Sequence, residues 1–397
     1  MPSGHEYMHL TDHCVLKNLE VPYLYDLKSD DLYELSPDAY TFLCRCSCGE
    51  APSVRKEDEE FLQFCLSEDL ITTSGRPVIR DMVTNRSPAP SLRYLELQIT
   101  DRCNLRCRHC YIGGGLDQDL PIEKVKRLFD EFEEIQGLRM LVSGGEPLLH
   151  PQFWEIHALL KDRAFRSILL SNGTLITRDT ARSLHVHEVQ ISLDGMKKGH
   201  ESVRGRGTYE KTLSAIDCLQ ESGIRVSIAT MIHRGNVKEF DQLASFIQSK
   251  GIEEWNIDLP CIKGRLVQHQ ELWVPAAEAA RFLEYGFGGG WHTTSLENAS
   301  CGAHLCAILP DGRVSKCGVF NEEPVGSIDE GLRVCWQWVP HIPLLDLRCN
   351  CLEKDACRGG CRYRAKLQGD LLGPDFFQCY ARGALKGGEK DEYQKGS

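Results

Sequence analysis

The feature of this sequence that most constrains its fold is a regular alternation of strand-like and helix-like runs between residues 89 and 290. Six short runs rich in apolar and β-branched residues are each followed by a run with helical apolar spacing; the strand-like runs lie at 92–99, 139–145, 166–172, 188–195, 225–232 and 253–260. Such alternation predicts a parallel sheet covered by helices, and therefore an α/β fold. Six units fall short of the eight that close a complete barrel.

The loop directly after the first of these strands carries three cysteines with the spacing CxxxCxxC: Cys103, Cys107 and Cys110. Iron–sulfur clusters are held by cysteine thiolates, and a four-iron cluster takes four of them, so three thiolates leave one iron open to an outside ligand. An open iron is typical of a catalytic cluster. The alternative is a structural zinc loop, which would normally supply CxxC pairs with a matching second half nearby.

Further polar residues follow the ends of later strands, where barrel enzymes carry their chemistry. The second strand ends in Gly144, Gly145 and Glu146; the glycines permit close backbone approach to a ligand, and the glutamate offers an acceptor for an ammonium group. Ser171 and Asn172 end the third strand, where an Asn-Gly turn and a cofactor contact are equally good interpretations.

The fourth and sixth strands end in further candidates. Ser192 and Asp194 close the fourth strand, and Arg204 follows them; a guanidinium suits a carboxylate because its donors match both oxygens. Asp258 and Cys261 near the end of the sixth strand would face the same mouth and could touch a substrate. A hydrogen-bonded aspartate and a buried cysteine are the simpler interpretations of these two.

The triplet and the strand-end motifs resemble the radical SAM superfamily, which implies a partial (β/α)6 barrel. In that family the open iron of a [4Fe-4S] cluster binds S-adenosylmethionine and cleaves it reductively to a 5′-deoxyadenosyl radical. The resemblance implies that Cys103, Cys107 and Cys110 hold this cluster and are catalytic. It also implies a set of cofactor-binding residues: Gly144, Gly145, Glu146, Ser171, Asn172, Ser192, Asp194 and Arg204.

Nine more cysteines lie between residues 301 and 379, and their spacing resembles that of the SPASM domain, which carries auxiliary iron–sulfur clusters. The resemblance groups Cys301, Cys306, Cys317 and Cys361 around a first auxiliary cluster, and Cys349, Cys351, Cys357 and Cys379 around a second. One departure is that the family usually has CxxC where this chain has Cys349-Asn350-Cys351. The alternative is a pair of zinc knuckles.

The N-terminal segment is expected to form a small module of its own. Two runs, YLYDL (23–27) and LYEL (32–35), predict a β-hairpin, and two helices follow from about Ser36 and Glu57. This pattern resembles the RiPP recognition element, a winged-helix module that binds the leader of a ribosomally made precursor peptide as an extra strand. An exposed edge such as YLYDL would supply the backbone groups for that pairing.

Together these observations predict a module at 1–88, the partial barrel at 89–290, the SPASM domain at 291–386 and a disordered tail at 387–397. The 57 acidic residues outnumber the 46 basic ones, which argues against nucleic acid as a partner. Because no run of about 18 apolar residues and no signal peptide is present, we expect a cytoplasmic protein without a membrane span. In that compartment 19 cysteines indicate metal rather than disulfides.

The combined resemblance predicts a radical SAM/SPASM peptide maturase that forms a thioether, a C–C crosslink or a related bond in a precursor peptide. It implies one or two auxiliary clusters and an electron donor such as flavodoxin or ferredoxin. Tetrapyrrole side-chain modification, as in the haem pathway, and sulfatase-maturating-type protein modification remain open. The latter enzymes have an aspartate after the cysteine that matches Cys317, whereas this chain has Gly318.

Overall fold

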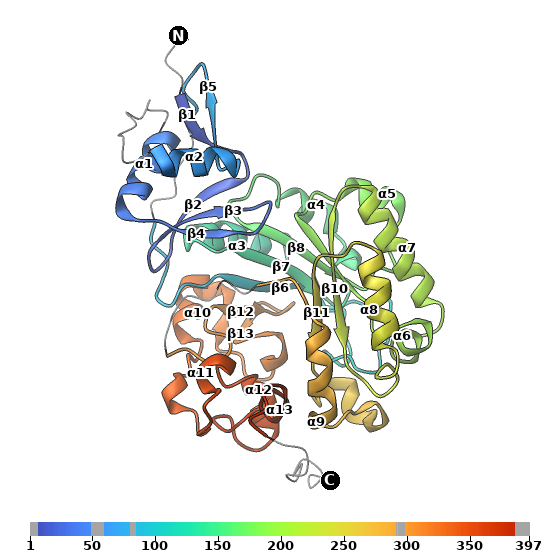
Figure 1. Ribbon diagram of the computed structural model, residues 1–397. Helices are drawn as coiled ribbons and strands as arrows, with labels where there is room; N and C mark the ends of the chain where they lie inside the picture. Colours follow the sequence, from blue (N-terminus) through green and yellow to red (C-terminus); the bar gives the residue numbers. More distant parts are fainter. Residues whose placement is uncertain (1–6, 49–58, 80–84, 291, 293–297, 386–397) are drawn as a thin grey trace.

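The predicted strand–helix units form the centre of the protein in its computed structural model, which describes residues 7–48, 59–79, 85–290, 292 and 298–385 (Figure 1). Six neighbouring strands pair in parallel, in the order of the chain: β6 (Tyr94–Thr100), β7 (Arg139–Gly144), β8 (Arg166–Ser171), β9 (Glu188–Ser192), β10 (Arg225–Met231) and β11 (Trp255–Asp258). The predicted α/β fold with a partial barrel is confirmed.

Helices connect these strands and cover one side of the sheet (Figure 1). They are α3 (Ile122–Glu134), α4 (Phe153–Ala158), α5 (Arg178–Ser183), α6 (Lys197–Arg204), α7 (Thr208–Glu221) and α8 (Phe240–Ser249). The short helix α9 (Ala276–Ala279) follows β11 and packs against α13 (Phe376–Ala381). On α3, residues spaced three and four apart form the buried stripe that a helix needs to pack on a sheet: Val125, Leu128, Phe129 and Phe132. None of the helices in the described ranges combines the length and apolar composition needed to cross a bilayer.

The C-terminal segment continues the barrel sheet. Strand β12 (Leu305–Ile308) pairs in parallel with β6, and β13 (Arg313–Ser315) and β14 (Gly326–Ser327) extend the sheet antiparallel. Four short helices follow: α10 (Leu332–Trp338), α11 (Lys354–Cys357), α12 (Arg362–Leu367) and α13 (Phe376–Ala381). The cysteine-rich part is therefore joined to the first barrel strand by backbone pairing. The tail at 387–397 lies outside the described residues.

The N-terminal module has two small antiparallel sheets and two helices. Strands β2 (Cys14–Asn18), β3 (Pro22–Asp26) and β4 (Leu32–Glu34) form one sheet, and β1 (Tyr7–Leu10) pairs with β5 (Ile71–Ser74). Helix α1 (Pro37–Ser47) begins at Ser36, whose side chain accepts from the Ala39 N–H, and α2 (Glu59–Ser67) follows. Because β3 lies between β2 and β4, the expectation that YLYDL offers an open edge is wrong.

The module is fixed to the barrel at the starts of the strands, the end away from the candidate site. The buried Lys17 ammonium donates to the carbonyls of Gly137, 2.7 Å away, and Ala164, 2.5 Å away. Arg139 on β7 pairs with Asp30 at 2.6 Å, in the turn between β3 and β4. These polar contacts surround a small apolar core in which Leu138 packs against tyrosines of the module.

Candidate functional site

The cysteine triplet lies in the loop that leaves the C-terminal end of β6. Cys107 is buried, Cys110 is half-buried and Cys103 is exposed. Asn104 fixes the loop to the end of β8, because its side chain donates to the Thr174 hydroxyl at 2.8 Å and accepts from the Asn172 side chain at 3.1 Å. The three predicted ligands therefore stand where parallel strands of the barrel end.

The surroundings of the triplet suit a cysteine-bound cluster. Although Cys103 keeps solvent-accessible surface, the protein around its thiol and the neighbouring Cys107 thiol raise the pKa of Cys103 to about 11, so the free thiol stays protonated at neutral pH. The guanidinium of Arg204 is close enough to Cys107 and Cys110 for its charge and theirs to interact. A thiol that coordinates metal is deprotonated, and a nearby cation compensates the negative charge that this adds.

Gly144 and Gly145 bring the end of β7 against the entry of the cysteine loop. A Cβ on Gly144 would lie 2.2 Å from the Thr100 carbonyl oxygen, and one on Gly145 would lie 2.3 Å from that of Arg102. The same segment is hydrogen-bonded to the loop, since the Glu146 N–H donates to the Arg102 carbonyl at 2.8 Å. Both glycines thus permit a close approach between two backbone segments, which fixes the loop relative to Glu146.

Glu146 is fully buried beside the triplet and is held by the end of β8. One carboxylate oxygen accepts from the Ser171 hydroxyl at 2.9 Å, and the other accepts from the Asn172 N–H at 2.9 Å. Burial raises the pKa of Glu146 to about 7 despite these two hydrogen bonds. The structure therefore brings three of the predicted cofactor residues together, with Ser171 and Asn172 orienting the carboxylate.

Asp194 and Arg204 form a buried ion pair beyond the end of β9. The Arg204 Nε donates to Asp194 Oδ2 at 2.5 Å, and Asp194 Oδ1 accepts from the Met231 N–H at 2.8 Å. Arg204 is the main cause that holds the pKa of Asp194 well below its usual range, against the opposing effect of burial. The aspartate therefore positions Arg204. Ser192, at the end of β9, is half-buried.

His109 is a site residue that the sequence reasoning missed. Its Nε2 lies 3.5 Å from Asp194 Oδ2 and 3.5 Å from the Arg204 guanidinium, and burial lowers its pKa to about 4. The ring is therefore neutral at pH 7. Its buried Nδ1 has no hydrogen-bond partner in the described part of the chain. The feature of the sequence that could have identified His109 is its position between Cys107 and Cys110.

Asp258, at the end of β11, belongs to the same region. It keeps solvent-accessible surface, yet enough protein surrounds it that burial and the Asp194 charge raise its pKa to about 6. Arg204 and Arg364 lie near enough to oppose this rise. Asp258 therefore stands between the Arg204 pair and the cysteine-rich segment.

The C-terminal cysteines form two groups. Cys301 is hydrogen-bonded to Cys361, and Cys317 lies beside Cys361. The second predicted set also gathers, because Cys379 lies near three other members: Cys349, Cys351 and Cys357. Cys306 does not join the first group. It is fully buried in β12, and its neighbours are Cys335 and Glu96.

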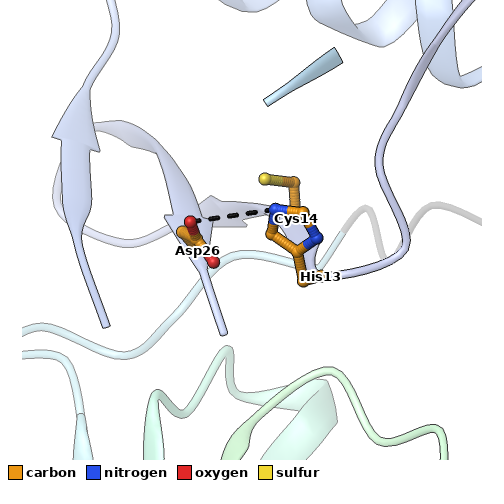
Figure 2. A group of neighbouring side chains, drawn as sticks. All are labelled: His13, Cys14 and Asp26. Carbon is orange, nitrogen blue, oxygen red and sulfur yellow. Dashed lines mark ion pairs between the residues drawn. The ribbon is translucent and has the colours of Figure 1, made fainter. Parts of the chain in front are cut away.

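A different set of possible ligands lies in the N-terminal module. Figure 2 shows His13, Cys14 and Asp26, whose ligand atoms lie within 4.8 Å of one another. The His13 ring pairs with Asp26 at 3.9 Å, and the other Asp26 oxygen accepts from the Lys28 N–H at 2.7 Å in the turn that follows. These contacts give Asp26 a structural role, because they link the end of β3 to the residue before β2 and to the turn after β3.

The fold is that of an α/β-barrel protein with a three-cysteine loop at the ends of its strands. Comparison with known proteins specifies the class: residues 97–247 match the Radical SAM superfamily. The chain therefore contains a radical SAM domain, whose cofactors are a [4Fe-4S] cluster and S-adenosylmethionine.

Several curated proteins are similar in sequence. The AdoMet-dependent heme synthase of Nitratidesulfovibrio vulgaris is 27% identical over 243 residues, 59% of this chain and 66% of that protein. The mycofactocin maturase MftC of Mycolicibacterium smegmatis is 28% identical over 325 residues, 71% of this chain and 81% of that protein. The chain spans somewhat less than two thirds of the heme synthases that it matches.

Solved structures show the same fold. Streptococcus suis SuiB bound to its precursor peptide SuiA has a TM-score of 0.68 at 13% identity, over 94% of this chain and 99% of that one. The enzyme anSMEcpe with bound AdoMet has a TM-score of 0.56 at 17% identity, over 73% of this chain and 94% of that one. The SuiB match extends the shared fold over nearly the whole chain.

Proposed function

We propose that this protein is a radical SAM peptide maturase that modifies a ribosomally synthesised precursor peptide. The observation that carries the proposal is an open strand edge in the N-terminal module, suited to an extended peptide. Similarity to the maturase MftC over 71% of the chain supports it. The antilisterial bacteriocin subtilosin biosynthesis protein AlbA of Bacillus subtilis, 29% identical over 280 residues, supports it further.

The open edge is β4. In the antiparallel pair with β3, the Leu35 N–H donates to the Pro22 carbonyl and the Asp26 N–H donates to the Asp31 carbonyl. Because inward and outward residues alternate along an antiparallel strand, the backbone groups of Leu32 and Glu34 point away from the sheet. An extended leader can pair with these groups by strand addition.

The opposite edge of the same sheet is largely occupied. The outward groups of β2 belong to alternate residues that include Cys14 and Asn18. The Cys14 N–H donates to the Thr11 carbonyl, and the Asn18 carbonyl accepts from the Ser87 N–H. The Asn18 N–H donates to the Gln136 side chain at 3.3 Å. Within the described ranges, β4 is therefore the better edge for a leader peptide.

In the barrel, the predicted site residues would bind the cluster or the cofactor. Cys103, Cys107 and Cys110 would hold the [4Fe-4S] cluster, which supplies the electron that cleaves S-adenosylmethionine and so generates the 5′-deoxyadenosyl radical. Glu146 would accept from the cofactor's ammonium group, with Ser171 and Asn172 orienting it. Arg204, held by Asp194, would bind a carboxylate, and Ser192 would contact the ribose.

The two C-terminal cysteine groups would hold auxiliary clusters, and an external donor such as flavodoxin or ferredoxin would supply electrons. The bond that the enzyme makes would be a thioether, a C–C crosslink or a related link. The heme synthases favour a second candidate, tetrapyrrole modification, because they match 59% of the chain. A tetrapyrrole has no backbone to pair with β4, so the N-terminal module distinguishes the two functions.

The test compares two substitutions of the exposed Glu34. Glu34→Pro removes the outward N–H, whereas Glu34→Ala removes only the side chain. We expect Glu34→Pro to weaken binding of the leader peptide of a candidate precursor by about 3- to 10-fold, which corresponds to the free energy of one hydrogen bond, and Glu34→Ala to leave binding unchanged. Fluorescence anisotropy with the full chain measures both.

Equal binding by both variants would contradict strand addition at β4. Binding of an iron porphyrin by the full chain, with no binding of the leader, would favour the second candidate.

A further inference from the structure

Cys261 lies beyond the end of β11 and meets the first group of C-terminal cysteines. Its thiol is hydrogen-bonded to Cys361, which also takes a hydrogen bond from Cys301. Cys317 is close enough to Cys361 for the charge of Cys361 to raise the pKa of the Cys317 thiol. Four thiols therefore converge from four separate segments of the chain, one of them at the mouth of the barrel.

Contacts that do not involve sulfur hold Cys261 in this position. Two residues later, the Lys263 ammonium donates to the Val319 carbonyl at 2.6 Å and to the Asn321 side chain at 2.5 Å, in the loop that follows Cys317. On the other side, the Cys361 N–H donates to Asp375 at 2.8 Å. The barrel segment and the C-terminal loops are thus fixed to one another around the four thiols.

Two cations accompany the four thiols. The Arg364 guanidinium lies beside Cys261 and Cys361, and Asp375 fixes it at 2.7 Å. The Lys316 ammonium, also buried, lies near Cys301 and Cys317. Buried thiolates need compensating charge, and thiolate is the form that binds iron. Arg364 is also paired with Asp375, and the Lys316 ammonium donates to the Pro340 carbonyl at 2.7 Å, so both cations are held in place close to the thiols.

Cys306 has a different environment from these four cysteines. Its backbone pairs with Leu95 of β6 inside the sheet, and its side chain belongs to the apolar core of the barrel. Burial raises the pKa of its thiol above the usual range, with Cys335 and Glu96 as further neighbours. A cluster bound at this position would have to displace the apolar side chains around Cys306.

We propose that Cys261 is the fourth ligand of the first auxiliary cluster, together with Cys301, Cys317 and Cys361, and that Cys306 is not a ligand. This inference rests on the proposed function, which includes that cluster. Four protein thiolates complete the ligand set of a four-iron cluster, so no iron stays open to the substrate. The first auxiliary cluster then transfers electrons, and the substrate does not bind to its iron.

The experiment uses the full chain with Cys103, Cys107 and Cys110 all replaced by Ala, so that only C-terminal clusters contribute. Into this parent, Cys261→Ala and, as the matched control, Cys306→Ala are introduced. After anaerobic reconstitution, iron, sulfide and Mössbauer spectra are measured. We expect Cys261→Ala to lose one cluster or one of its irons, and Cys306→Ala to match the parent.

Cys261→Ser is a second variant in case the alanine variant does not fold, which circular dichroism reports. Its hydroxyl keeps the shape of the side chain, and oxygen ligation alters the Mössbauer parameters of one iron site. Unchanged iron, sulfide and spectra in the Cys261 variants would overturn the ligand assignment, as would loss of the same cluster in Cys306→Ala. A parent without C-terminal iron would overturn both this assignment and the auxiliary clusters of the proposed function.

Discussion

Replacing Glu146 by Gln tests the cofactor site most directly. The carboxylate accepts one hydrogen bond from Ser171 and one from Asn172. In the amide, one oxygen becomes an NH2 group, so one of these donors loses its acceptor at a cost of about 1–3 kcal/mol. The charge-assisted hydrogen bond to the cofactor's ammonium group is also lost, at about 1.5–3 kcal/mol. The second loss alone weakens binding of S-adenosylmethionine by about 10- to 160-fold.

The pH dependence of S-adenosylmethionine binding provides a second test of this role of Glu146. Because burial raises the pKa of Glu146 to about 7, the free protein holds this group half-protonated at neutral pH. Only the ionised form attracts an ammonium group, so the Kd for S-adenosylmethionine falls as the pH rises towards 7 and then levels off. Below that value the Kd changes by about tenfold per pH unit. Glu146→Gln has no proton to lose at this position and should show no such slope.

The assay is equilibrium dialysis of labelled S-adenosylmethionine with the reconstituted protein at pH 6 and pH 8, without oxygen and without a reductant. The matched control is Glu155→Gln, which changes an exposed glutamate on α4. If Glu146→Gln bound the cofactor with the Kd and pH slope of the unmodified protein, the assignment of Glu146 to the ammonium group would be refuted.

Three further predictions concern the rest of the chain. Replacing the cysteine triplet by Ala should abolish formation of 5′-deoxyadenosine, and undiminished cleavage would disprove the catalytic assignment. Asp194→Asn leaves Arg204 buried without a counter-charge, so the free energy of unfolding in urea should fall by about 3–5 kcal/mol; an unchanged midpoint would argue against it. Lys17→Met should destabilise the protein by about 1–3 kcal/mol because two buried carbonyls lose their donor. Burial lowers the pKa of Lys17 to about 7, whereas its pKa in the unfolded chain is about 10.4. The free energy of unfolding of the unmodified protein therefore rises as the pH increases from 7 towards 10.4. The loss of stability caused by Lys17→Met should accordingly be larger at pH 9 than at pH 7.

Periodicity was sufficient to predict the barrel because each strand–helix unit buries its own apolar stripe. The stripe on α3 and the strand-end position of the cysteine loop follow from local sequence in this way. The helix-like run after the sixth strand is only partly α-helical, since α9 ends at Ala279 and a 3-10 helix continues to Tyr285. This segment packs against α8 and α13, and such tertiary contacts are invisible to local periodicity.

The features that local sequence does not locate all depend on partners distant in sequence. Cys306 fits the spacing of a ligand, but the parallel pairing of β12 with β6 places it in the core. Cys261 lies 100 residues before Cys361, and nothing in its local sequence marks that contact. Likewise, the run YLYDL reads as a hairpin edge until β2 pairs with its other side. Spacing predicts which residue types are available, whereas tertiary pairing decides which of them meet.

In the proposed function, the docking of the N-terminal module at the starts of the barrel strands would set a minimum length for the peptide substrate. Lys17 contacts the residues that precede β7 and β8, whereas the cysteine triplet follows the far end of β6. The 7 residues of β6 span roughly 23 Å at about 3.3 Å per residue. A peptide anchored on β4 therefore needs at least about seven extended residues before its reactive carbon reaches the mouth of the barrel. If the module binds the leader as proposed, shortening the spacer of a precursor below this length should move modification to a later residue or prevent it.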